Sequence, residues 1–377
     1  MEHRPLGSTG LIASVLGFGG MRIPGKPEDE VAALIARALD LGITYFDTAP
    51  GYGNSEELIG KAIAGRDLGG VVFSTKTHVG SDKDADAVRR RAEESLRRMG
   101  LSRLDVLQMW GINNWEMAQQ VLAPGGPLEG ARRLQDEGLV GHIGFTTHAL
   151  TDDALRVMNT GEFVSVTGRY HYLDSVYDPL RERARELGMA FVAMTPLGQG
   201  WLARPSPALR EALEGEDPVC FALRWIVNHP GVTTAIVGAS SLQELEAAYA
   251  ALGDGLGEFG RYDSLAKRVI ARMVEALGAD YCTGCRQCLP CPADINIPEL
   301  LRLNNLLRAY ELVDWCKDRY KFMGNAGTWY PGVKADQCTE CGECEPRCPE
   351  RVPIIRLLQA LHEELFEGER GRLSRED

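Results

Sequence analysis

Cysteine residues crowd the C-terminal part of this 377-residue chain. Ten are present, and nine of them fall between Cys282 and Cys348. Eight of these nine form two runs, Cys282-x2-Cys285-x2-Cys288-x2-Cys291-Pro and Cys338-x2-Cys341-x2-Cys344-x3-Cys348-Pro. Closely spaced cysteines in a chain without an export signal bind metal more often than they form disulfides. The runs therefore predict metal binding.

The second run matches the C-x2-C-x2-C-x3-C-P pattern of bacterial ferredoxins. In that pattern three cysteines bind one [4Fe-4S] cluster and the fourth binds the other. The resemblance implies one cluster on Cys282, Cys285, Cys288 and Cys348, and a second on Cys338, Cys341, Cys344 and Cys291. The first run is one residue shorter before Cys291. Four-cysteine zinc sites are the alternative. Cys220 and Cys316 lie outside both runs, and we expect them to be ordinary core or surface thiols.

Eight strand-like and eight helix-like segments alternate over the first ~255 residues, the pattern of a (β/α)8 barrel. A doubly wound sheet is the alternative, but Gly17–Met21 does not complete the glycine-rich loop that such a sheet would carry. The expected strands are Ser14–Gly17, Ile43–Asp47, Val71–Lys76, Leu104–Trp110, His142–Phe145, Phe163–Thr167, Met189–Met194 and Thr233–Val237.

Two short motifs stand where barrel strands are expected to end, which is where catalytic residues lie in this fold. The second strand runs into Phe46-Asp47-Thr48-Ala49-Pro50-Gly51-Tyr52-Gly53-Asn54-Ser55-Glu56, and the third ends in Ser74-Thr75-Lys76. Together with the opening RPLGSTGLIASVLGFGGMR, they resemble the aldo-keto reductase family over about residues 3–252. The cysteine-rich part resembles the C-terminal module of that family's iron–sulfur branch.

The resemblance implies carbonyl reduction by hydride, with Tyr52 as the proton donor. A phenol titrates near pH 10, and a nearby ammonium group lowers that pKa. Lys76 would supply the ammonium and Asp47 would position it. The family's fourth catalytic residue is a histidine, but here Trp110 stands in its place. An indole can donate one hydrogen bond and cannot carry a proton. His148 and His171 follow the fifth and sixth strands as candidate substitutes.

The family's nicotinamide-binding positions are also altered. The residues that correspond to them are Thr146, Thr147, Thr167, Met194, Gly238, Ser240 and Ser241. The last three lie in a segment that resembles the family's phosphate-binding helix N-terminus. No arginine follows to grip an adenosine 2′-phosphate, and Glu244 would repel one. The resemblance therefore implies NAD(P)H as cofactor, with NADH favoured over NADPH.

Composition excludes several classes of protein. The net charge of −12 argues against nucleic acid as a partner, since phosphate binding needs a basic surface. No run of 18 apolar residues is present, so we expect no membrane partner, and the N-terminus has no secretory signal. We expect a cytoplasmic protein with a barrel over 1–255, a linker helix over 256–280, a mainly α-helical, ferredoxin-like dicluster domain over 281–362 and a charged tail over 363–377.

Two functional hypotheses follow. The first is an oxidoreductase that acts on a small carbonyl or activated unsaturated substrate, with the clusters relaying electrons to or from a ferredoxin-like or other redox protein. A hydride carries two electrons and each cluster one, so a simple carbonyl reductase has no evident need of clusters. The second is a catalytically altered barrel that serves as an electron-transfer or redox-sensing subunit. A third interpretation makes the clusters purely structural.

Overall fold

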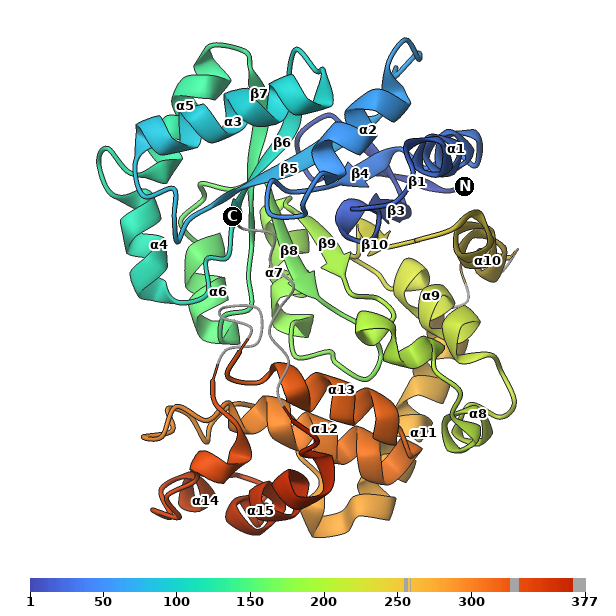
Figure 1. Cartoon of the computed structure of the whole chain (residues 1–377), viewed down its shortest axis with the longest axis vertical. Coiled ribbons are helices and arrows are strands. Elements are labelled where there is room, and N and C mark those ends of the chain that lie inside the picture. Colours follow the sequence, from blue (N-terminus) through green and yellow to red (C-terminus); the bar gives the residue numbers. More distant parts are fainter. Residues whose placement is uncertain (254–256, 258, 326–331, 369–377) are drawn as a thin grey trace. The chain divides into compact units, whose positions relative to one another are not determined.

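The computed structural model describes residues 1–253, 257, 259–325 and 332–368 (Figure 1). The chain forms two compact units. The first contains Met1–Gln199 and Val219–Tyr262, and the second contains Gly200–Pro218 and Asp263–Asp377. The boundary expected at residues 255–256 lies outside the described residues. A helix, α11, runs from Phe259 to Leu277 and passes from the first unit into the second.

The first unit is a closed barrel of eight parallel strands in the order β10-β3-β4-β5-β6-β7-β8-β9. This closure confirms the expected (β/α)8 barrel and excludes the open doubly wound sheet. The strands are β3 Leu16–Gly19, β4 Tyr45–Asp47, β5 Val72–His78, β6 Leu104–Trp110, β7 Val140–Thr146, β8 Ser165–Arg169, β9 Ala190–Met194 and β10 Thr234–Val237.

Helices connect successive strands around the outside of the barrel, and Figure 1 shows α1, α2, α3 and α5 along its upper part. Their bounds are α1 Glu28–Asp40, α2 Ser55–Ile63, α3 Ala85–Met99, α4 Trp115–Leu122, α5 Pro127–Asp136, α6 Thr151–Met158, α7 Asp178–Leu187, α9 Pro218–Asn228 and α10 Leu242–Leu252. Most present an apolar stripe to the strands, as in α3, where Val88, Ala92 and Leu96 are buried and the arginines face outward.

An antiparallel hairpin, β1 His3–Pro5 with β2 Ile12–Ser14, precedes the barrel. Leu6 and Ala13 from this hairpin join a buried cluster with Tyr45, Val72, Val106, Ala190, Val192 and Ile236, all of which lie in barrel strands. These strand residues lie toward the N-terminal half of the barrel interior, so the hairpin closes that end. The first barrel strand begins at Leu16 rather than near Ser14, because Ser14 pairs with His3 in the hairpin.

Strand alternation then dictates which side chains reach the opposite end of the barrel interior. Successive residues of a strand point to opposite faces, so Ser74, Lys76 and His78 share the inward face with Val72. On β6, Gln108 and Trp110 follow Val106 in the same way. The register places Lys76 beside Gln108 and His78 beside Trp110. Polar inward residues thus gather where the strands end.

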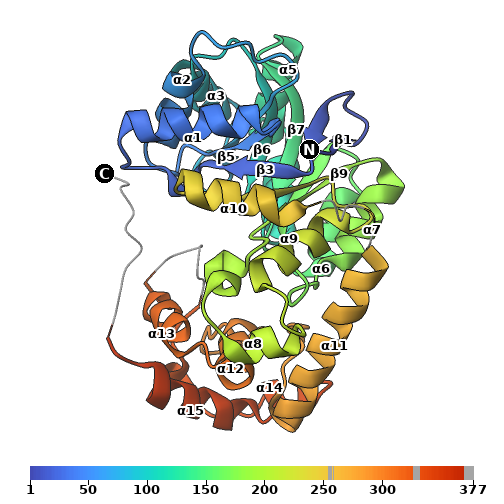
Figure 2. The same cartoon turned by 90° about the vertical axis from the view of Figure 1, so that its right-hand side faces the viewer.

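The second unit is mainly helical, as expected. Besides most of α11 it contains α8 Pro207–Ala212, α12 Ile297–Tyr310, α13 Val313–Phe322, α14 Cys344–Arg347 and α15 Ile354–Leu365, several of which are visible in Figure 2. The buried apolar side chains of α12 and α15 form its core, because α15 buries Leu357, Leu358 and Leu361 along one stripe. The first cysteine run lies in the loop before α12, and the second extends from the loop before α14 through α14 itself.

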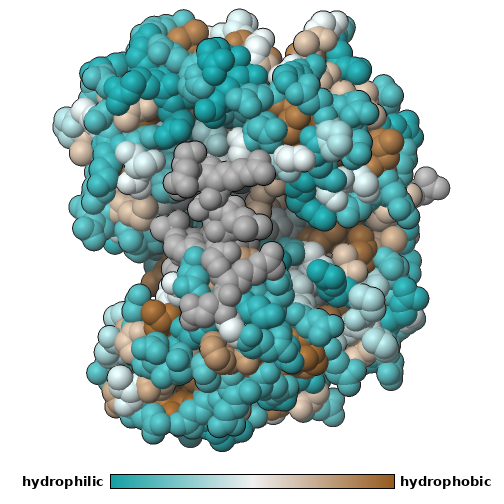
Figure 3. All heavy atoms as spheres, in the orientation of Figure 1, coloured by the Kyte–Doolittle hydropathy of each residue, from teal (hydrophilic) through white to brown (hydrophobic). Residues whose placement is uncertain are grey.

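Among the described residues, no helix is long and apolar enough to span a membrane. On the face drawn in Figure 3, apolar side chains are scattered among hydrophilic ones. The most exposed large apolar side chains, such as Ile12, Leu150 and Val274, are far apart in the sequence.

Candidate active site and cluster sites

A buried ion pair lies at the C-terminal end of the barrel interior. The Lys76 ammonium Nζ donates to Asp47 Oδ1 at 2.5 Å and to the backbone carbonyl oxygen of Thr48 at 2.7 Å. Only 3% of the Lys76 side chain and 7% of the Asp47 side chain are exposed. Burial alone would lower the pKa of Lys76, but the Asp47 carboxylate and the Tyr52 hydroxyl raise it above its ordinary value. These two groups thus favour the charged form of Lys76.

Tyr52 lies directly above this cation. The Lys76 Nζ atom is 4.8 Å from the centroid of the Tyr52 ring, and the two side chains are hydrogen-bonded. An ammonium at this position stabilises a phenolate and so eases proton release from Tyr52. The structure thus brings together Asp47, Lys76 and Tyr52, the three residues that the sequence motifs suggested.

Two further residues of the motif around Tyr52 hold the loop after β4 in place. Ser55 Oγ donates to the Gly20 carbonyl oxygen at 2.8 Å and lies 2.9 Å from Thr48 Oγ1. Glu56, which is 1% exposed, accepts a hydrogen bond from Thr75 Oγ1 at 2.7 Å. These contacts tie the loop after β4 to β5, and they explain why serine and glutamate follow the tyrosine in this motif.

Gln108 is a site residue that the sequence analysis missed. Its Nε2 donates to Asp47 Oδ2 at 2.9 Å and to Ser74 Oγ at 2.6 Å, and its Oε1 accepts from Thr167 Oγ1 at 2.7 Å. Gln108 is fully buried. A buried chain therefore runs from Thr167 through Gln108 and Asp47 to Lys76. The sequence did carry a signal for this role, because Gln108 stands among the apolar residues of β6 and a buried polar side chain needs hydrogen-bond partners.

Trp110 fills the place beside Tyr52. Their ring centroids are 5.7 Å apart in an edge-on arrangement. A Cβ atom on Gly51 would lie 2.8 Å from the six-membered ring of Trp110, so this glycine permits the close approach. The His78 ring also lies against Trp110, with 5.1 Å between the ring centroids. Of the histidines proposed as substitutes, His148 is exposed, and His171 is buried with Nδ1 accepting from the Leu173 backbone.

The threonines expected at the nicotinamide site form hydrogen bonds to other groups of the protein. Thr146 Oγ1 accepts from the Gly111 backbone at 3.0 Å, and Thr147 Oγ1 donates to the Ile112 carbonyl oxygen at 2.7 Å. The Thr167 hydroxyl donates to Gln108. These three hydroxyls help to hold neighbouring strands and loops, while Met194 is half-buried at the end of β9.

The segment expected to bind a nucleotide phosphate carries an internal carboxylate. Glu244 Oε2 accepts from the Ser240 backbone at 2.8 Å and from Ser240 Oγ at 2.9 Å. Arg22 lies 3.3 Å from the same carboxylate and donates to the Gly238 carbonyl oxygen. Ser241 caps α10 by accepting from the Glu244 backbone. The residues that could bind a dinucleotide are present, but a negative charge already lies among them.

The two cysteine runs have matching backbone conformations. In the first, Gly284 and Arg286 flank Cys285 with φ angles of 74° and 65°. In the second, Glu340 and Gly342 flank Cys341 with φ angles of 55° and 77°. Left-handed conformations at arginine and glutamate are uncommon and require support from their surroundings. The same conformation at equivalent positions indicates that both runs bind the same kind of group.

The cysteines line two hollows in the second unit. One, of about 300 Å³, is lined by Cys282, Cys285, Cys288 and Cys348. The other, of about 350 Å³, is lined by Cys291, Cys338, Cys341 and Cys344, with Cys288 at its edge. Apart from Cys288, which lines both hollows, each hollow groups the cysteines that the ferredoxin pattern puts on one cluster. The assignment of each cysteine to a cluster stays a prediction.

The residues fit iron–sulfur clusters better than zinc. A zinc ion needs four thiolates within about 2.3 Å of one point. Among the described residues, no three cysteine, histidine or acidic side chains converge closely enough to hold a single metal ion. The Gly284 backbone donates to Cys282 Sγ at 3.4 Å, a hydrogen bond of the kind that tunes cluster sulfurs. Burial raises the pKa of Cys282 to about 11 and of Cys288 to about 12, so cluster binding would have to displace their protons.

The remaining cysteines and aromatic residues have structural surroundings. Cys316 is buried and donates to the Leu303 carbonyl oxygen, and Cys220 is half-buried. Trp315 is buried against Trp201, and Tyr320 is buried beside His362. Trp329 and Tyr330 lie outside the described residues.

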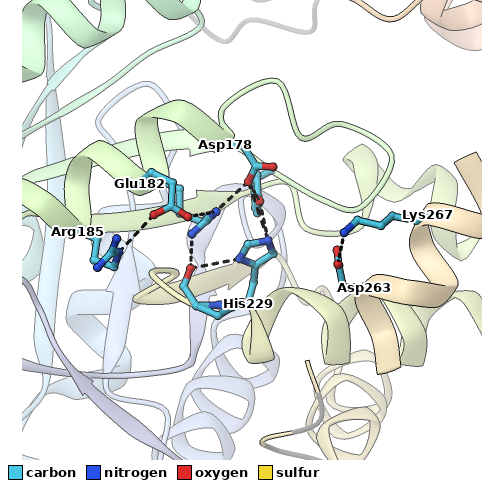
Figure 4. A network of polar contacts seen from close by, with 9 residues as sticks. Asp178, Glu182, Arg185, His229, Asp263 and Lys267 are labelled. Atoms are coloured by element: carbon cyan, nitrogen blue, oxygen red, sulfur yellow. Dashed lines mark hydrogen bonds and ion pairs between the residues drawn. The ribbon is translucent and has the colours of Figure 1, made fainter. Parts of the chain in front are cut away.

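A second polar network lies on the outer layer of the barrel (Figure 4). His229, just after α9, lies 3.9 Å from Asp178 at the start of α7, and the Tyr170 hydroxyl bonds to both. Arg181 links Asp178 to the Pro230 carbonyl oxygen. These contacts join α7 to the turn that precedes β10, so their evident role is structural. Lys267 and Asp263, also drawn, form a separate pair on α11.

Comparison with known proteins assigns both parts of the chain. The Aldo/keto reductase family matches residues 15–255, and the 4Fe-4S dicluster domain matches residues 281–352. The L-galactose dehydrogenase of Arabidopsis thaliana is 28% identical over 284 residues, which cover 67% of this chain and 88% of the relative. The 6-dehydroglucose reductase of Novosphingobium aromaticivorans is 28% identical over 63% of this chain and 85% of its own length.

Solved structures that resemble the barrel belong to the same family. The holo form of the aldo-keto reductase AKR11C1 from Bacillus halodurans superposes with a TM-score of 0.62 and 25% identity, covering 71% of this chain and 96% of that one. A putative aldo-keto reductase from Pseudomonas aeruginosa has a TM-score of 0.56 and 29% identity, covering 67% and 95%.

Proposed function

This chain belongs to the aldo/keto reductase family and carries a 4Fe-4S dicluster domain, and we propose that it reduces a small carbonyl or activated unsaturated compound while its clusters relay electrons. The observation that carries the proposal is the buried Asp47–Lys76 pair beneath Tyr52 at the catalytic end of the barrel. The two curated relatives are named for reactions of sugars, which favours an oxygen-rich carbonyl substrate.

Proton transfer is the step that these residues perform. Tyr52 donates its hydroxyl proton to the substrate oxygen as negative charge develops there. Lys76 stabilises the resulting phenolate, and Asp47 keeps Lys76 charged and in place. Gln108 holds the second oxygen of Asp47, so the carboxylate cannot rotate away from the ammonium. A nicotinamide cofactor, when bound, supplies the hydride.

We infer that NADH is preferred over NADPH. By the family resemblance, the Glu244 carboxylate would face an adenosine 2′-phosphate, and like charges repel. The carboxylate could instead accept hydrogen bonds from a free ribose hydroxyl.

The eight cysteines around the two hollows would hold two [4Fe-4S] clusters. When bound, these supply one-electron transfer, which would couple the barrel to a ferredoxin-like or other redox protein. Cytoplasmic conditions keep such thiolates reduced, and we place the protein there.

The test uses protein purified without oxygen and assayed for iron and sulfide. Oxidation of NADH is then followed with a panel of small aldehydes and enones. Tyr52→Phe and Lys76→Met should each lower kcat by about 100-fold or more, while Tyr249→Phe, on the outer helix α10, should not. Equal rates in all variants would contradict the proposed site.

The alternative, an electron-transfer or redox-sensing subunit, is favoured by Trp110 and by the engaged hydroxyls of Thr146 and Thr147. It predicts clusters that are reduced reversibly, as seen by electron paramagnetic resonance, with no binding of NADH or NADPH. Quenching of tryptophan fluorescence by either nucleotide would exclude it.

A further inference from the structure

The two cysteine runs carry opposite charges at the positions where their backbones agree. The left-handed residues next to the middle cysteine are Gly284 and Arg286 in the first run, and Glu340 and Gly342 in the second. Glycine adopts this conformation without strain, whereas arginine and glutamate do not. Each run therefore has a charged side chain where the other has glycine. Because the backbone does not require these charges, we look for their effect on the group that each run binds.

The cysteines of the two runs are equally exposed. In both runs the first cysteine is half-buried, the second exposed, the third buried and the fourth half-buried. The reduction potential of an iron–sulfur cluster depends on solvent exposure, on nearby charge and on hydrogen bonds to sulfur. Since the exposure of the ligands is matched, charge and hydrogen bonding are left to distinguish the two sites. The first site is the hollow of Cys282, Cys285, Cys288 and Cys348, and the second site is the hollow of Cys291, Cys338, Cys341 and Cys344.

A carboxylate without a cationic partner lies at the edge of the second site. Glu340 stands between Thr339 and Cys341 in the chain, and both of these residues line that site. Its Oε1 atom accepts from Gln359 Nε2 on α15 at 2.6 Å, so the side chain is held in place. In the described part of the chain no lysine or arginine pairs with Glu340, and its negative charge is not offset there.

The other charges near the two sites are offset locally. Glu343 pairs with Arg347 at 2.7 Å. Glu345 accepts a hydrogen bond from a backbone N–H in the first turn of α15, where the helix dipole favours a negative charge. Arg286 and Glu350 both line the first site, so their opposite charges offset each other. The carboxylate held by α15 therefore makes the second site the more negative one.

A hydrogen bond to sulfur favours the same order. The Gly284 N–H donates to Cys282 Sγ in the first site at 3.4 Å. Among the residues that the structure describes, the equivalent N–H of Glu340 makes no such bond to Cys338. Reduction adds one negative charge to a cluster. A donated hydrogen bond stabilises that charge, and a nearby carboxylate destabilises it.

We propose that the two sites have unequal reduction potentials, the first site being reduced before the second, and that Arg286 and Glu340 set this order. The inference rests on the proposed function in one respect, namely that the eight cysteines hold two [4Fe-4S] clusters. One electron passes from a one-electron redox protein, which is oxidised, to the first site, which is reduced, and no bond or proton moves. Glu340 keeps the second site oxidised until a stronger donor arrives. The domain therefore holds a single electron over a range of potentials.

The experiment is a potentiometric titration of the full chain with its clusters, without oxygen, substrate or nucleotide and at one fixed pH. Electron paramagnetic resonance counts the reduced clusters at each potential. Wild-type protein should show two waves of equal size. We expect their midpoints to lie at least ~59 mV apart, which is a tenfold difference in the ratio of reduced to oxidised cluster for one electron.

Two charge variants assign the waves to the sites. Glu340→Gln keeps a side chain that can bond to Gln359 and should raise only the lower midpoint, by ~28 mV or a threefold change in that ratio. Arg286→Gln should lower only the upper midpoint by a similar amount. Glu340→Gly and Arg286→Gly, which introduce the glycine of the other run and relieve the left-handed strain, should reproduce both shifts. Glu211→Gln removes an exposed charge on α8 that lines neither site and should move neither wave.

An iron assay on the same samples separates the inference from the proposed function. Roughly eight irons per chain with a single wave, or with both waves moving together in Glu340→Gln, would overturn the inference while cluster binding stands. Arg286→Gln moving the lower wave would overturn the proposed order. A chain that binds no iron would overturn both. Because no substrate is present, an absence of carbonyl reduction leaves the result unaffected.

Discussion

The side-chain amide of Asn305 makes two hydrogen bonds to the backbone of Cys282. Asn305 Nδ2 donates to the Cys282 carbonyl oxygen at 2.7 Å, and Asn305 Oδ1 accepts from the Cys282 N–H at 3.2 Å. Asn305 is buried on α12, so its helix fixes the two peptide groups that flank the first cysteine. Among the residues that the structure describes, no side chain bonds to the Cys338 backbone in this way, and its N–H donates to the Ala335 carbonyl oxygen within its own turn.

Asn305→Ala should therefore affect one cluster and spare the other. Loss of both hydrogen bonds frees Cys282 and should weaken or shift the electron paramagnetic resonance signal of the cluster that it binds. The matched control is Asn304→Ala, since Asn304 is equally buried on α12 but donates to Asp280 rather than to a cysteine. Equal loss of both signals, or identical spectra in the two variants, would count against a positioning role for Asn305.

The assignment of cysteines to clusters can be tested one thiol at a time. Cys285→Ser should remove the cluster lined by Cys282, Cys288 and Cys348, and Cys341→Ser should remove the other, so that each variant retains about half of the roughly eight iron atoms expected for two [4Fe-4S] clusters. Each spectrum should keep the signal that its counterpart loses. Cys316→Ala, which changes a buried thiol outside both hollows, should retain all the iron.

Cys291 decides whether the last cysteines are exchanged between the runs. It lines the hollow of Cys338, Cys341 and Cys344, so the spectrum of Cys291→Ser should match that of Cys341→Ser. A match to Cys285→Ser would mean that each run binds its own cluster.

The spacing of residues within short stretches was enough to predict the cluster-binding cysteines and the proton-transfer residues. The cysteine runs and the Asp47, Tyr52 and Lys76 motifs lie within short stretches, and the alternation of strands and helices predicted the barrel that joins them. In a barrel of this kind the C-terminal ends of all strands lie at the same end, so residues at strand ends were expected to meet. The start of the first strand was misplaced because the N-terminal hairpin competes for Ser14.

Contacts between distant segments could not be predicted. Gln108 meets Asp47 across 61 positions of sequence, and Asn305 meets Cys282 across 23. A single polar residue in an apolar stretch signals that a partner exists but not which one. For the same reason His148 and His171 were proposed as substitutes for the family's histidine, whereas the histidine ring that lies against Trp110 is His78.

Glu244 should set the choice of nucleotide. Glu244→Gln removes the negative charge and keeps a side chain that can bond to Ser240. Repulsion of a 2′-phosphate then disappears, so the Kd for NADPH should fall by about tenfold, which corresponds to ~1.4 kcal/mol, while the Kd for NADH changes little. Fluorescence titration of both nucleotides measures this. Glu246→Gln, on the same helix but paired with Arg37, is the control. A parallel change for both nucleotides would contradict a discriminating role.

Asp82 should make the loop after β5 sensitive to acid. Burial raises the pKa of Asp82, but hydrogen bonds from Arg91 and Thr77 and the charge of Arg91 outweigh burial and hold it below the ordinary value. A carboxyl group whose pKa is lowered in the folded state stabilises the fold above its unfolded pKa of about 3.9, and this contribution is lost as the pH falls through the lower folded value. Between pH 7 and pH 5 the contribution should be complete.

Asp82→Asn should therefore destabilise the loop at pH 7 by roughly 1–3 kcal/mol, the cost of leaving buried partners unsatisfied. Hydrogen–deuterium exchange of peptides that cover β5 and α3 measures it, with variant and wild type compared at each pH. The difference should be constant down to about pH 4 and shrink below it. Asp86→Asn, an exposed change on α3, should show no difference at any pH. A gap between Asp82→Asn and wild type that widens as the pH falls would show that Asp82 does not act through its charge.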